Sequence, residues 1–465
     1  MVREETIAAI CTGLTDSGIG IIRISGKKAV EIGNRLFQLR SGKKILMNGE
    51  RHRMYHGFVV NEEKFVIDEV MAVVMKAPKS FTGEDTVEIQ CHGGVLVMQK
   101  ILSAALSCGA RLAEPGEFTK RAFLNGKMDL SRAEAVMDVI HSQNEYALAS
   151  SISQLRGNLS REVKRIREEI IHEVAFIESS LDDPEHFSLD QYPEELADKL
   201  DGFIRKVKKW IDTAENGKII KEGIRTVIVG KPNAGKSSLL NFLVGEERAI
   251  VTDVAGTTRD ILQENIRLGE VSLNVIDTAG IRDTKDIVEK IGVEKTKEYA
   301  ETADLIVYVV DASTDLDEND RMIVSLIKDK PVIVLLNKSD LKNMVNEEMI
   351  KDLFAFHHLE PVMIKTSARD GEGMDLFEKT VREMFFQEEM KSSNQIVITN
   401  IRHKEALEDT LDSLLLVNKS IEEGMPEDFY SIDLMNAYAS LGRITGEEVD
   451  DDLVEEIFSK FCMGK

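Results

Sequence analysis

The stretch Gly230-Lys231-Pro232-Asn233-Ala234-Gly235-Lys236-Ser237 matches the pattern G-x-x-x-x-G-K-[ST] of a phosphate-binding loop. The apolar residues 225–229 before it read as a buried strand, and residues 238–243 after it read as the start of a helix. A phosphate-binding loop requires this order of strand, loop and helix. The match therefore predicts a phosphate site, and a glycine-rich loop that arises by chance is a weak alternative.

The residue types in this loop fit the chemistry of phosphate. Gly230 and Gly235 allow the backbone N–H groups to point inward, and the helix N-terminus adds a partial positive charge. Lys236 is expected to reach the β- and γ-phosphates, and the Ser237 hydroxyl is expected to bind Mg²⁺. A nucleoside triphosphate with Mg²⁺ is the ligand that the loop predicts.

The loop begins an α/β unit that extends from about residue 223 to residue 386. Apolar runs alternate with helical patterns along this unit, which is typical of a parallel sheet with helices on both faces. Further strands are expected near 271–276, 305–310, 332–336 and 362–364.

Four short motifs lie in the loops or at the strand ends: Gly256-Thr257-Thr258-Arg259-Asp260, Asp277-Thr278-Ala279-Gly280, Asn337-Lys338-Ser339-Asp340 and Thr366-Ser367-Ala368. A threonine of the first can close on Mg²⁺ and the γ-phosphate, Asp277 can hold the Mg²⁺ shell, and the Gly280 N–H can approach the γ-phosphate. A buried Asp340 carboxylate can accept from guanine N1–H and the 2-amino group, a pair that adenine does not offer. The last motif can give a backbone N–H to guanine O6. With the phosphate-binding loop, the ordered set predicts a GTP-binding domain.

The second of these motifs also bears on hydrolysis. It is followed by Ile281, where Ras-like switches have the glutamine that orients the attacking water. Of the nearby carboxylates Asp283, Asp286 and Glu289, we expect Glu289 to position the water instead. Asn233 places an additional carbonyl oxygen near the β- and γ-phosphates, where a monovalent cation can bind, although most loop asparagines only cap or turn.

Composition limits the other classes of protein. The 465 residues suffice for about three domains, and the net charge of −23 argues against a protein that coats nucleic acid, because such binding requires Lys and Arg. No apolar run approaches the ~20 residues of a membrane span, and no signal-peptide core follows the N-terminus. The four cysteines form no C-x-x-C pair. We therefore expect a cytoplasmic protein with reduced thiols and no membrane contact.

Changes in periodicity divide the chain into four predicted segments. Residues 1–118 alternate short apolar runs with turns, which indicates an α+β domain with a largely antiparallel sheet. Residues 119–219 and 386–465 have long helical periodicity. The simplest architecture is one helical domain in two pieces with the α/β unit, bounded at 220–385, inserted between them. Two separate helical domains would give the same periodicity.

Several stretches outside the α/β unit point to a known family. Taken alone, Phe81-Thr82-Gly83-Glu84-Asp85 and Cys91-His92-Gly93-Gly94 read as turns. They occur together with Pro115-Gly116-Glu117-Phe118, Arg121-Ala122-Phe123-Leu124-Asn125-Gly126-Lys127 and the ending Phe461-Cys462-Met463-Gly464-Lys465. With these motifs, essentially the whole chain resembles the MnmE, or TrmE, family of tRNA modification GTPases. Met463 is a mild departure, because Ile or Leu is usual there.

The resemblance implies a multidomain α/β fold. Its parts are an N-terminal α+β folate-binding domain that also forms a homodimer, a split α-helical domain, and an inserted Ras-like P-loop GTPase domain. It also implies a reaction carried out with a separate FAD-dependent partner of the MnmG (GidA) type, as a heterotetramer. The reaction places an aminomethyl or carboxymethylaminomethyl group on C5 of the wobble uridine of certain tRNAs. The one-carbon unit comes from a tetrahydrofolate derivative, which binds in the 5,10-methylene or 5-formyl form.

The family motifs imply roles for individual residues. The expected folate contacts are Arg23, Glu84, Lys127 and Lys465. The expected K⁺ ligands are Asn233, Thr252, Val254 and Thr257, and the expected Mg²⁺ ligands are Ser237 and Thr258. The expected GTP contacts are Asn233, Ala234, Gly235, Lys236, Ser237, Ser238, Thr252, Thr257, Thr258, Asp277, Thr278, Ala279, Gly280, Asn337, Lys338, Asp340, Ser367, Ala368 and Arg369. The residues expected to be catalytic are Glu289, Lys236 and Cys462.

The resemblance further implies that two GTPase domains meet across K⁺-bound switch loops. The cation then supplies the charge stabilisation that other GTPases obtain from an arginine finger, and hydrolysis is K⁺-stimulated. Two other readings remain open. A regulatory switch GTPase in translation or assembly would need no folate chemistry, and a plain folate-dependent methyltransferase would leave the inserted GTPase domain unexplained.

Overall fold

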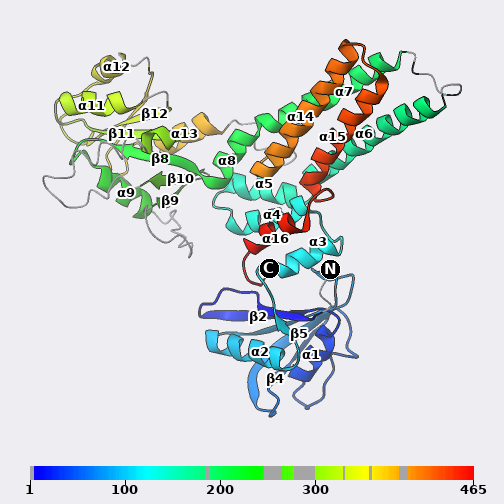
Figure 1. Cartoon of the computed structure of the whole chain (residues 1–465). Helices are drawn as coiled ribbons and strands as arrows, with labels where there is room; N and C mark the ends of the chain where they lie inside the picture. Colours follow the sequence, from blue (N-terminus) through cyan, green and yellow to red (C-terminus); the bar gives the residue numbers. More distant parts are fainter. Residues whose placement is uncertain are drawn as a thin grey trace. The chain divides into compact units, whose positions relative to one another are not determined.

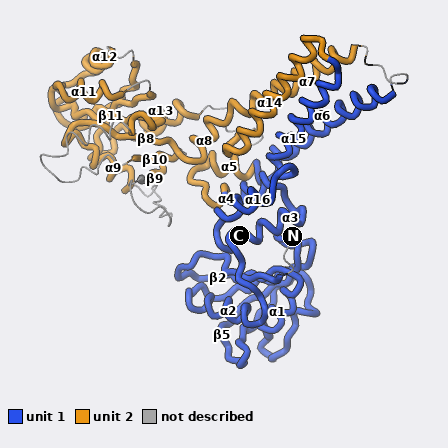
Figure 2. The backbone as a smooth tube through the Cα atoms, viewed as in Figure 1, with its two compact units in different colours: residues 1–137, 154–188, 426–465 blue, residues 138–153, 189–425 orange. Residues whose placement is uncertain are grey.

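The computed structural model describes residues 5–183, 186, 189, 191–245, 263–269, 271–276, 299–327, 330–355, 359–386 and 396–464. The chain divides into two compact units, which Figure 2 colours separately. Unit 1 comprises residues 1–137, 154–188 and 426–465, and unit 2 comprises residues 138–153 and 189–425. The divisions after residues 137 and 153 fall inside α4 (Leu130–His141) and α5 (Glu145–Leu155).

Unit 1 has a seven-stranded sheet within its described residues (Figure 1). The strand order is β3-β4-β5-β6-β2-β1-β7, and every neighbouring pair is antiparallel except β1 with β7. The strands are β1 (Ile7–Ile10), β2 (Ser17–Ser25), β3 (Phe37–Gln38), β4 (Met54–Val60), β5 (Val66–Met75), β6 (Thr86–Gly93) and β7 (Arg111–Leu112). The expected antiparallel sheet is confirmed. The expected turn at Cys91–Gly93 is wrong, because these residues pair within β6.

Helices cover both faces of this sheet. The helices of unit 1 are α1 (Ala29–Leu36), α2 (Val95–Ser107), α3 (Glu117–Leu124), α6 (Asn158–Asp182), α15 (Glu427–Thr445) and α16 (Asp451–Ser459). Side chains alternate along a strand, so Ala8 of β1 packs with α1 and α2, whereas Ile7 and Ala9 pack with Phe118 of α3. α3 therefore lies on the face opposite to α1 and α2.

Helices from before and after the α/β unit in sequence pack against each other. In unit 1, α6 packs with α15, and in unit 2, α7 (Tyr192–Asp212) packs with α14 (Ile401–Glu422) (Figure 1). α6 buries Val163, Ile166 and Ile170 at helical spacing. These pairings are what one helical domain in two pieces predicts, and the bounds of the predicted segments stay a prediction.

Unit 2 has a six-stranded sheet within its described residues, in the order β13-β12-β11-β8-β10-β9. The strands are β8 (Ile224–Val229), β9 (Gln263–Leu268), β10 (Val271–Ile276), β11 (Leu305–Asp311), β12 (Val332–Asn337) and β13 (Val362–Lys365). All neighbours are parallel except β9, which pairs antiparallel with β10. The parallel sheet is confirmed, with an antiparallel edge strand that the sequence did not indicate.

The helices of unit 2 enclose this sheet. They include α8 (Ala214–Glu222), α9 (Lys236–Gly245), α11 (Glu318–Leu326), α12 (Glu347–Ala355) and α13 (Met374–Phe385). Leu239 of α9 and Phe377 of α13 share one buried cluster, whereas Val324 of α11 and Phe354 of α12 share another. The helices therefore lie on two faces, as the doubly wound pattern predicts. Across the described ranges, no helix is both long and apolar enough to span a membrane.

The chain enters and leaves the α/β unit at adjacent places. The Ile398 N–H donates to Thr213 Oγ1 over 3.1 Å, although the two residues are 185 positions apart. A Cβ at Gly217 of α8 would overlap the Ile398 carbonyl. The segments before and after the α/β unit are therefore in direct contact.

Candidate functional site

The phosphate-binding loop joins the end of β8 to the start of α9. Gly230 and Gly235 both have positive φ, at 154° and 104°. A Cβ at Gly230 would overlap the carbonyl of Val309, and a Cβ at Gly235 would overlap the side-chain amide of Asn337. Only glycine leaves space for the neighbouring strands at these two positions.

The Lys236 side chain folds back over the loop. Its Nζ donates to the carbonyls of Gly230 at 2.7 Å and Lys231 at 2.8 Å. Burial lowers the pKa of Lys236, and no carboxylate of the described residues pairs with it. A phosphate group would supply the anion that this ammonium lacks.

Asn337 joins the phosphate-binding loop to the loop that follows β13. It is only 3% exposed, its Nδ2 donates to the Ala234 carbonyl at 2.8 Å, and its Oδ1 accepts from the Ala368 N–H at 3.1 Å. The Ser339 N–H donates to the Thr366 carbonyl at 3.1 Å. The structure thus brings together three of the predicted GTP-binding motifs.

The other residues of the Asn337 motif differ in their environment. Asp340 is exposed in the turn after β12, so the expected burial of its carboxylate is wrong, and Asn337 is the buried member of the motif. Lys338 pairs with Asp311 through an Nζ–Oδ2 contact of 2.5 Å. Burial raises the pKa of Asp311, but hydrogen bonds from Lys338 and Ser313 outweigh it and lower the pKa overall.

Asp311 is a residue that the sequence reasoning missed. The sequence signal for it is its position at the end of β11, next to β12, whose last residue directly precedes Lys338. Of the remaining described contacts of the predicted site, Ser367 is fully buried and its Oγ donates to Asp370 at 2.9 Å. The others, Asn233, Ser237, Ser238 and Arg369, are exposed. Asn233 has a φ of 60°, a conformation that asparagine tolerates better than most residues.

Ten predicted site residues lie outside the described residues: Thr252, Val254, Thr257, Thr258, Asp277, Thr278, Ala279, Gly280, Glu289 and Lys465. They include the two threonines of the motif at 256–260, the whole motif at 277–280 and the expected water-orienting carboxylate of Glu289. The K⁺ ligands other than Asn233, the Mg²⁺ ligand Thr258 and the role of Glu289 stay predictions.

The predicted folate contacts of unit 1 gather around the loop between β5 and β6. The Arg23 Nε donates to Glu88 Oε1 at 2.8 Å, and its guanidinium lies 5.2 Å from the ring centroid of Phe81. A Cβ placed at Gly83 would lie 3.1 Å from Lys127 Cγ, so the Lys127 side chain runs across this glycine. Arg23 thus lies beside Phe81 and Lys127 beside Gly83, in the same loop that carries Glu84. All three described residues of the predicted folate site therefore lie at this loop.

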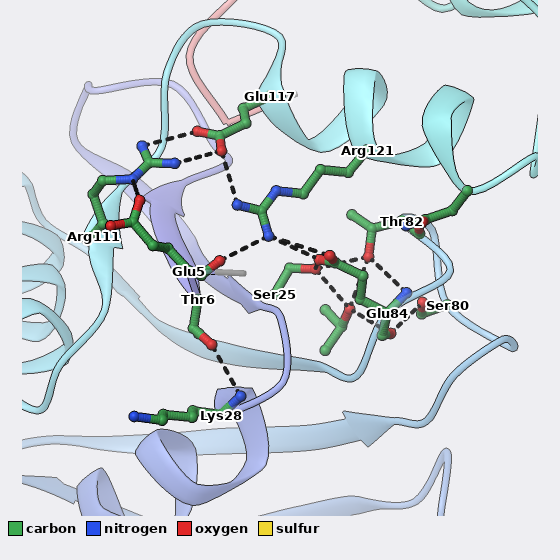
Figure 3. A network of polar contacts seen from close by, with 12 residues as sticks. Glu5, Thr6, Ser25, Lys28, Ser80, Thr82, Glu84, Arg111, Glu117 and Arg121 are labelled. Atoms are coloured by element: carbon green, nitrogen blue, oxygen red, sulfur yellow. Dashed lines mark hydrogen bonds and ion pairs between the residues drawn. The ribbon is translucent and has the colours of Figure 1, made fainter. Parts of the chain in front are cut away.

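The Glu84 carboxylate belongs to a network of polar contacts (Figure 3). Ser25 Oγ donates to Glu84 Oε2 at 2.8 Å, and the Arg121 guanidinium donates to both carboxylate oxygens at 3.1 and 3.3 Å. Arg121 also donates to Glu117 Oε1 at 2.9 Å. Arg111 donates to both oxygens of Glu117, at 2.6 and 3.1 Å. The network extends from the β5–β6 loop through α3 to β7.

Glu117 is ionised in this network. Burial raises its pKa, but hydrogen bonds from Arg111, the Glu114 N–H and Arg121 outweigh the burial and hold the pKa below its usual 4.5. Above pH 4.5 the carboxylate is ionised in both folded and unfolded chains, so its full contribution to stability is present. As the pH falls further, the unfolded chain binds the proton first, and this contribution is lost through the lower folded pKa.

A Glu117→Gln variant tests this contribution. We expect the free energy of unfolding of unit 1 to fall by about 2–4 kcal/mol near neutral pH, because the buried Arg121 and the partly buried Arg111 lose their shared anion. Between about pH 6 and about pH 3.5, the variant should lose less stability than the parent protein, since it lacks the carboxylate that titrates. Urea unfolding at both pH values measures the difference. Equal pH dependence in the two proteins would contradict the assignment.

The C-terminal segment meets the start of the sheet in unit 1. The Gly116 N–H donates to the Cys462 carbonyl at 3.4 Å, and Gly464, with a φ of 86°, lies where a Cβ would overlap the Ile10 carbonyl. Cys462 is exposed. The structure thus places this predicted catalytic cysteine beside the turn before α3, and its chemical role stays a prediction.

Arg121 and Ser25 were not predicted to contact a functional residue. Glu117 and Arg121 are four positions apart on α3, which is the spacing of an ion pair on one helix face. That spacing was visible in the sequence. The connection to Glu84 was not, because Arg121 and Glu84 are 37 positions apart.

Comparisons with known proteins match two consecutive regions that together cover nearly the whole chain. Residues 6–127 match the family described as "GTP-binding protein TrmE N-terminus", and residues 130–462 match the family described as "MnmE helical domain". A relative from Lachnoclostridium phytofermentans is 54% identical over 463 residues, which cover 100% of both chains. Relatives from Clostridioides difficile and Acetivibrio thermocellus are 47% and 46% identical, with 99% and 100% of each chain covered. All three are named "tRNA modification GTPase MnmE".

The match to the helical family begins in α4 and ends after α16, so it spans the inserted α/β unit. The match to the N-terminal family contains the described folate candidates Arg23, Glu84 and Lys127. Together with the full-length relatives, these matches agree with the resemblance seen in the sequence motifs. The chain therefore belongs to the MnmE family of tRNA modification GTPases.

Proposed function

We propose that this protein binds and hydrolyses GTP and that hydrolysis serves the modification of tRNA. The observation that carries the proposal is the partly buried Lys236 ammonium, which lies over a glycine-lined loop without a carboxylate partner among the described residues. The hydrogen bonds by which Asn337 joins this loop to the Thr366–Ala368 motif support guanine as the base. The names of the full-length relatives support tRNA as the substrate.

Two metal ions belong to this proposal. Ser237, with Thr258, would hold Mg²⁺, and Asn233, with Thr252, Val254 and Thr257, would hold K⁺. When bound, these cations neutralise charge on the phosphates. Ser237 and Asn233 fit these roles because both are exposed in the loop beside Lys236, where oxygen ligands suit hard cations. Glu289 would orient the attacking water.

The N-terminal cluster supports a tetrahydrofolate derivative as a second ligand. The Glu84 carboxylate can accept from the donor edge of the pterin, and Arg23, Lys127 and Lys465 can pair with the anionic glutamate tail. The folate would supply the carbon that is attached to C5 of a wobble uridine, in concert with an FAD-dependent partner of the MnmG type. A homodimer joined through the N-terminal domains, and a heterotetramer with this partner, complete the proposal.

Calorimetric titration with 5-formyl-tetrahydrofolate tests the folate site. We expect the parent protein to bind, and we expect Glu84→Gln and Arg23→Ala each to weaken binding by about tenfold or more, because each loses a charged hydrogen bond. Arg40→Ala is the matched control in the same domain, since Arg40 is 72% exposed and pairs with Glu69 away from the cluster. The control should bind within about twofold of the parent.

The same titrations, combined with assays of nucleotide hydrolysis, distinguish the proposed enzyme from a regulatory switch GTPase. GTP hydrolysis without folate binding at high micromolar concentration would favour a switch in translation or assembly. Equal hydrolysis of ATP and GTP would contradict the proposed recognition of guanine by Asp340 and Asn337.

A further inference from the structure

The Glu84 carboxylate is held by side chains that face it from two other elements. Ser25, at the end of β2, is fully buried and donates to Oε2 at 2.8 Å. Arg121, on α3, donates to Oε2 at 3.1 Å and to Oε1 at 3.3 Å. The Glu84 side chain is 18% exposed, so the carboxylate lies at the edge of the buried network and not inside it.

Arg121 is itself fixed on every side. Its side chain is 5% exposed, and one guanidinium nitrogen donates to the Glu5 carbonyl at 2.9 Å while the other donates to Glu117 at 2.9 Å. Glu117 is in turn held by Arg111. A guanidinium presents its donors in one rigid plane, so the positions of Glu5 and Glu117 determine where Arg121 points toward Glu84.

We propose that Arg121 and Ser25 are positioning residues that set the orientation of the Glu84 carboxylate for its ligand. The proposal rests on the proposed folate function, because that function makes Glu84 the acceptor of the pterin's donor edge. Neither Arg121 nor Ser25 needs to touch the ligand. They act through Glu84, as the outer partners of a ligand-binding group act on that group.

The hydrogen-bond inventory of Glu84 supports this division of roles. An ionised carboxylate has about four lone-pair sites, and Arg121 and Ser25 occupy part of them. No other described side chain donates to these two oxygens, so the remaining sites can accept from a ligand that offers two adjacent N–H donors. A carboxylate that could rotate freely would lose rotamer entropy on binding, and the network removes that cost in advance.

A double-mutant cycle with 5-formyl-tetrahydrofolate as the probe tests the proposal. The variants are Arg121→Lys, Glu84→Gln and the two combined. Lysine keeps the positive charge but cannot donate to Glu5, Glu84 and Glu117 in one fixed plane. We expect Arg121→Lys to weaken binding by about tenfold. In the Glu84→Gln background the same change should have an effect of less than about twofold, because the residue through which it acts is already altered.

Arg167→Lys is the matched control. Arg167 is also 5% exposed and also paired with a glutamate, Glu447, but it lies on α6 and contacts Tyr438. It should leave folate affinity unchanged. A merely structural role for Arg121 would instead weaken binding by the same factor in both backgrounds, and this outcome would overturn the proposal.

The outcomes separate the two levels of inference. If the parent protein does not bind the probe, the folate function fails. If the parent binds, Glu84→Gln loses affinity and Arg121→Lys does not, the folate function stands and the positioning role fails. If Arg121→Lys does not fold by circular dichroism, Ser25→Ala replaces it in the cycle. It removes one donor to Glu84, and we expect about threefold weaker binding that disappears in the Glu84→Gln background. An unchanged affinity in Ser25→Ala would then overturn the proposal.

Discussion

Gly235→Ala is expected to bind GTP about 100-fold more weakly, or not measurably, because its effects add to roughly 3 kcal/mol or more. One effect is backbone strain at a φ of 104°, and the other is the overlap of the new Cβ with the Asn337 amide. Displacing that amide breaks its hydrogen bonds to Ala234 and Ala368. A single methyl group would then disturb both the phosphate-binding loop and the loop after β13 that contains Thr366–Ala368.

Calorimetry with GTP in the presence of Mg²⁺ and K⁺ measures this effect. Gly245→Ala is the matched control at the end of the helix that follows Gly235, since a Cβ there has no neighbour within 4 Å and the position has no positive φ. The control should bind GTP normally and lose no stability. Near-normal affinity in Gly235→Ala would show that the loop and Asn337 do not act together.

Lys236→Met is expected to lower kcat for GTP hydrolysis by about 10²–10³-fold, because it removes a donor aimed at charge that develops on the phosphates. In contrast to the loss of activity, the stability of the folded protein should be unchanged or higher in this variant. Burial lowers the pKa of Lys236, so the folded protein disfavours this charge, and no described carboxylate loses a partner when it is removed. We therefore expect an unfolding temperature equal to or above that of the parent.

Single-turnover hydrolysis and thermal unfolding, measured on the same preparation, test both parts. Lys379→Met is the control, because Lys379 is 59% exposed and its contact with Glu383 is 3.7 Å long. It should change neither quantity. If Lys236→Met hydrolysed GTP at the rate of the control, Lys236 could not be the phosphate-contacting lysine.

Local pattern was sufficient for most of the α/β unit. The five parallel strands of its described residues and its glycine-lined loop follow from apolar runs and motif spacing within short windows. β9 was not predicted because its sequence, Gln263–Leu268, contains charged residues and no long apolar run, so its pairing with β10 depends on the neighbouring strand. Asp311 was missed because its partner Lys338 lies 27 positions away.

The N-terminal site depends more on contacts distant in sequence. Arg23, Glu84 and Lys127 were named through family motifs, and periodicity gave no reason to expect them near one loop. Their convergence depends on β2, the β5–β6 loop and the end of α3, which only the folded sheet brings together. The pairing that buries Arg121 depends on the same fold and was equally invisible in the sequence.

The contact between Thr213 and Ile398 bears on the order in which the chain folds. Pairing α7 with α14 in an unfolded chain would require closing a very long loop, and the entropy of closure grows with loop length. Once the α/β unit has folded, its two ends are already adjacent, and the effective loop shrinks to the few residues around Thr213 and Ile398. Folding of the inserted domain therefore prepares the assembly of the helical domain that surrounds it. During synthesis, the first helical segment, which contains α7, cannot pack with α14 until the second segment has been made.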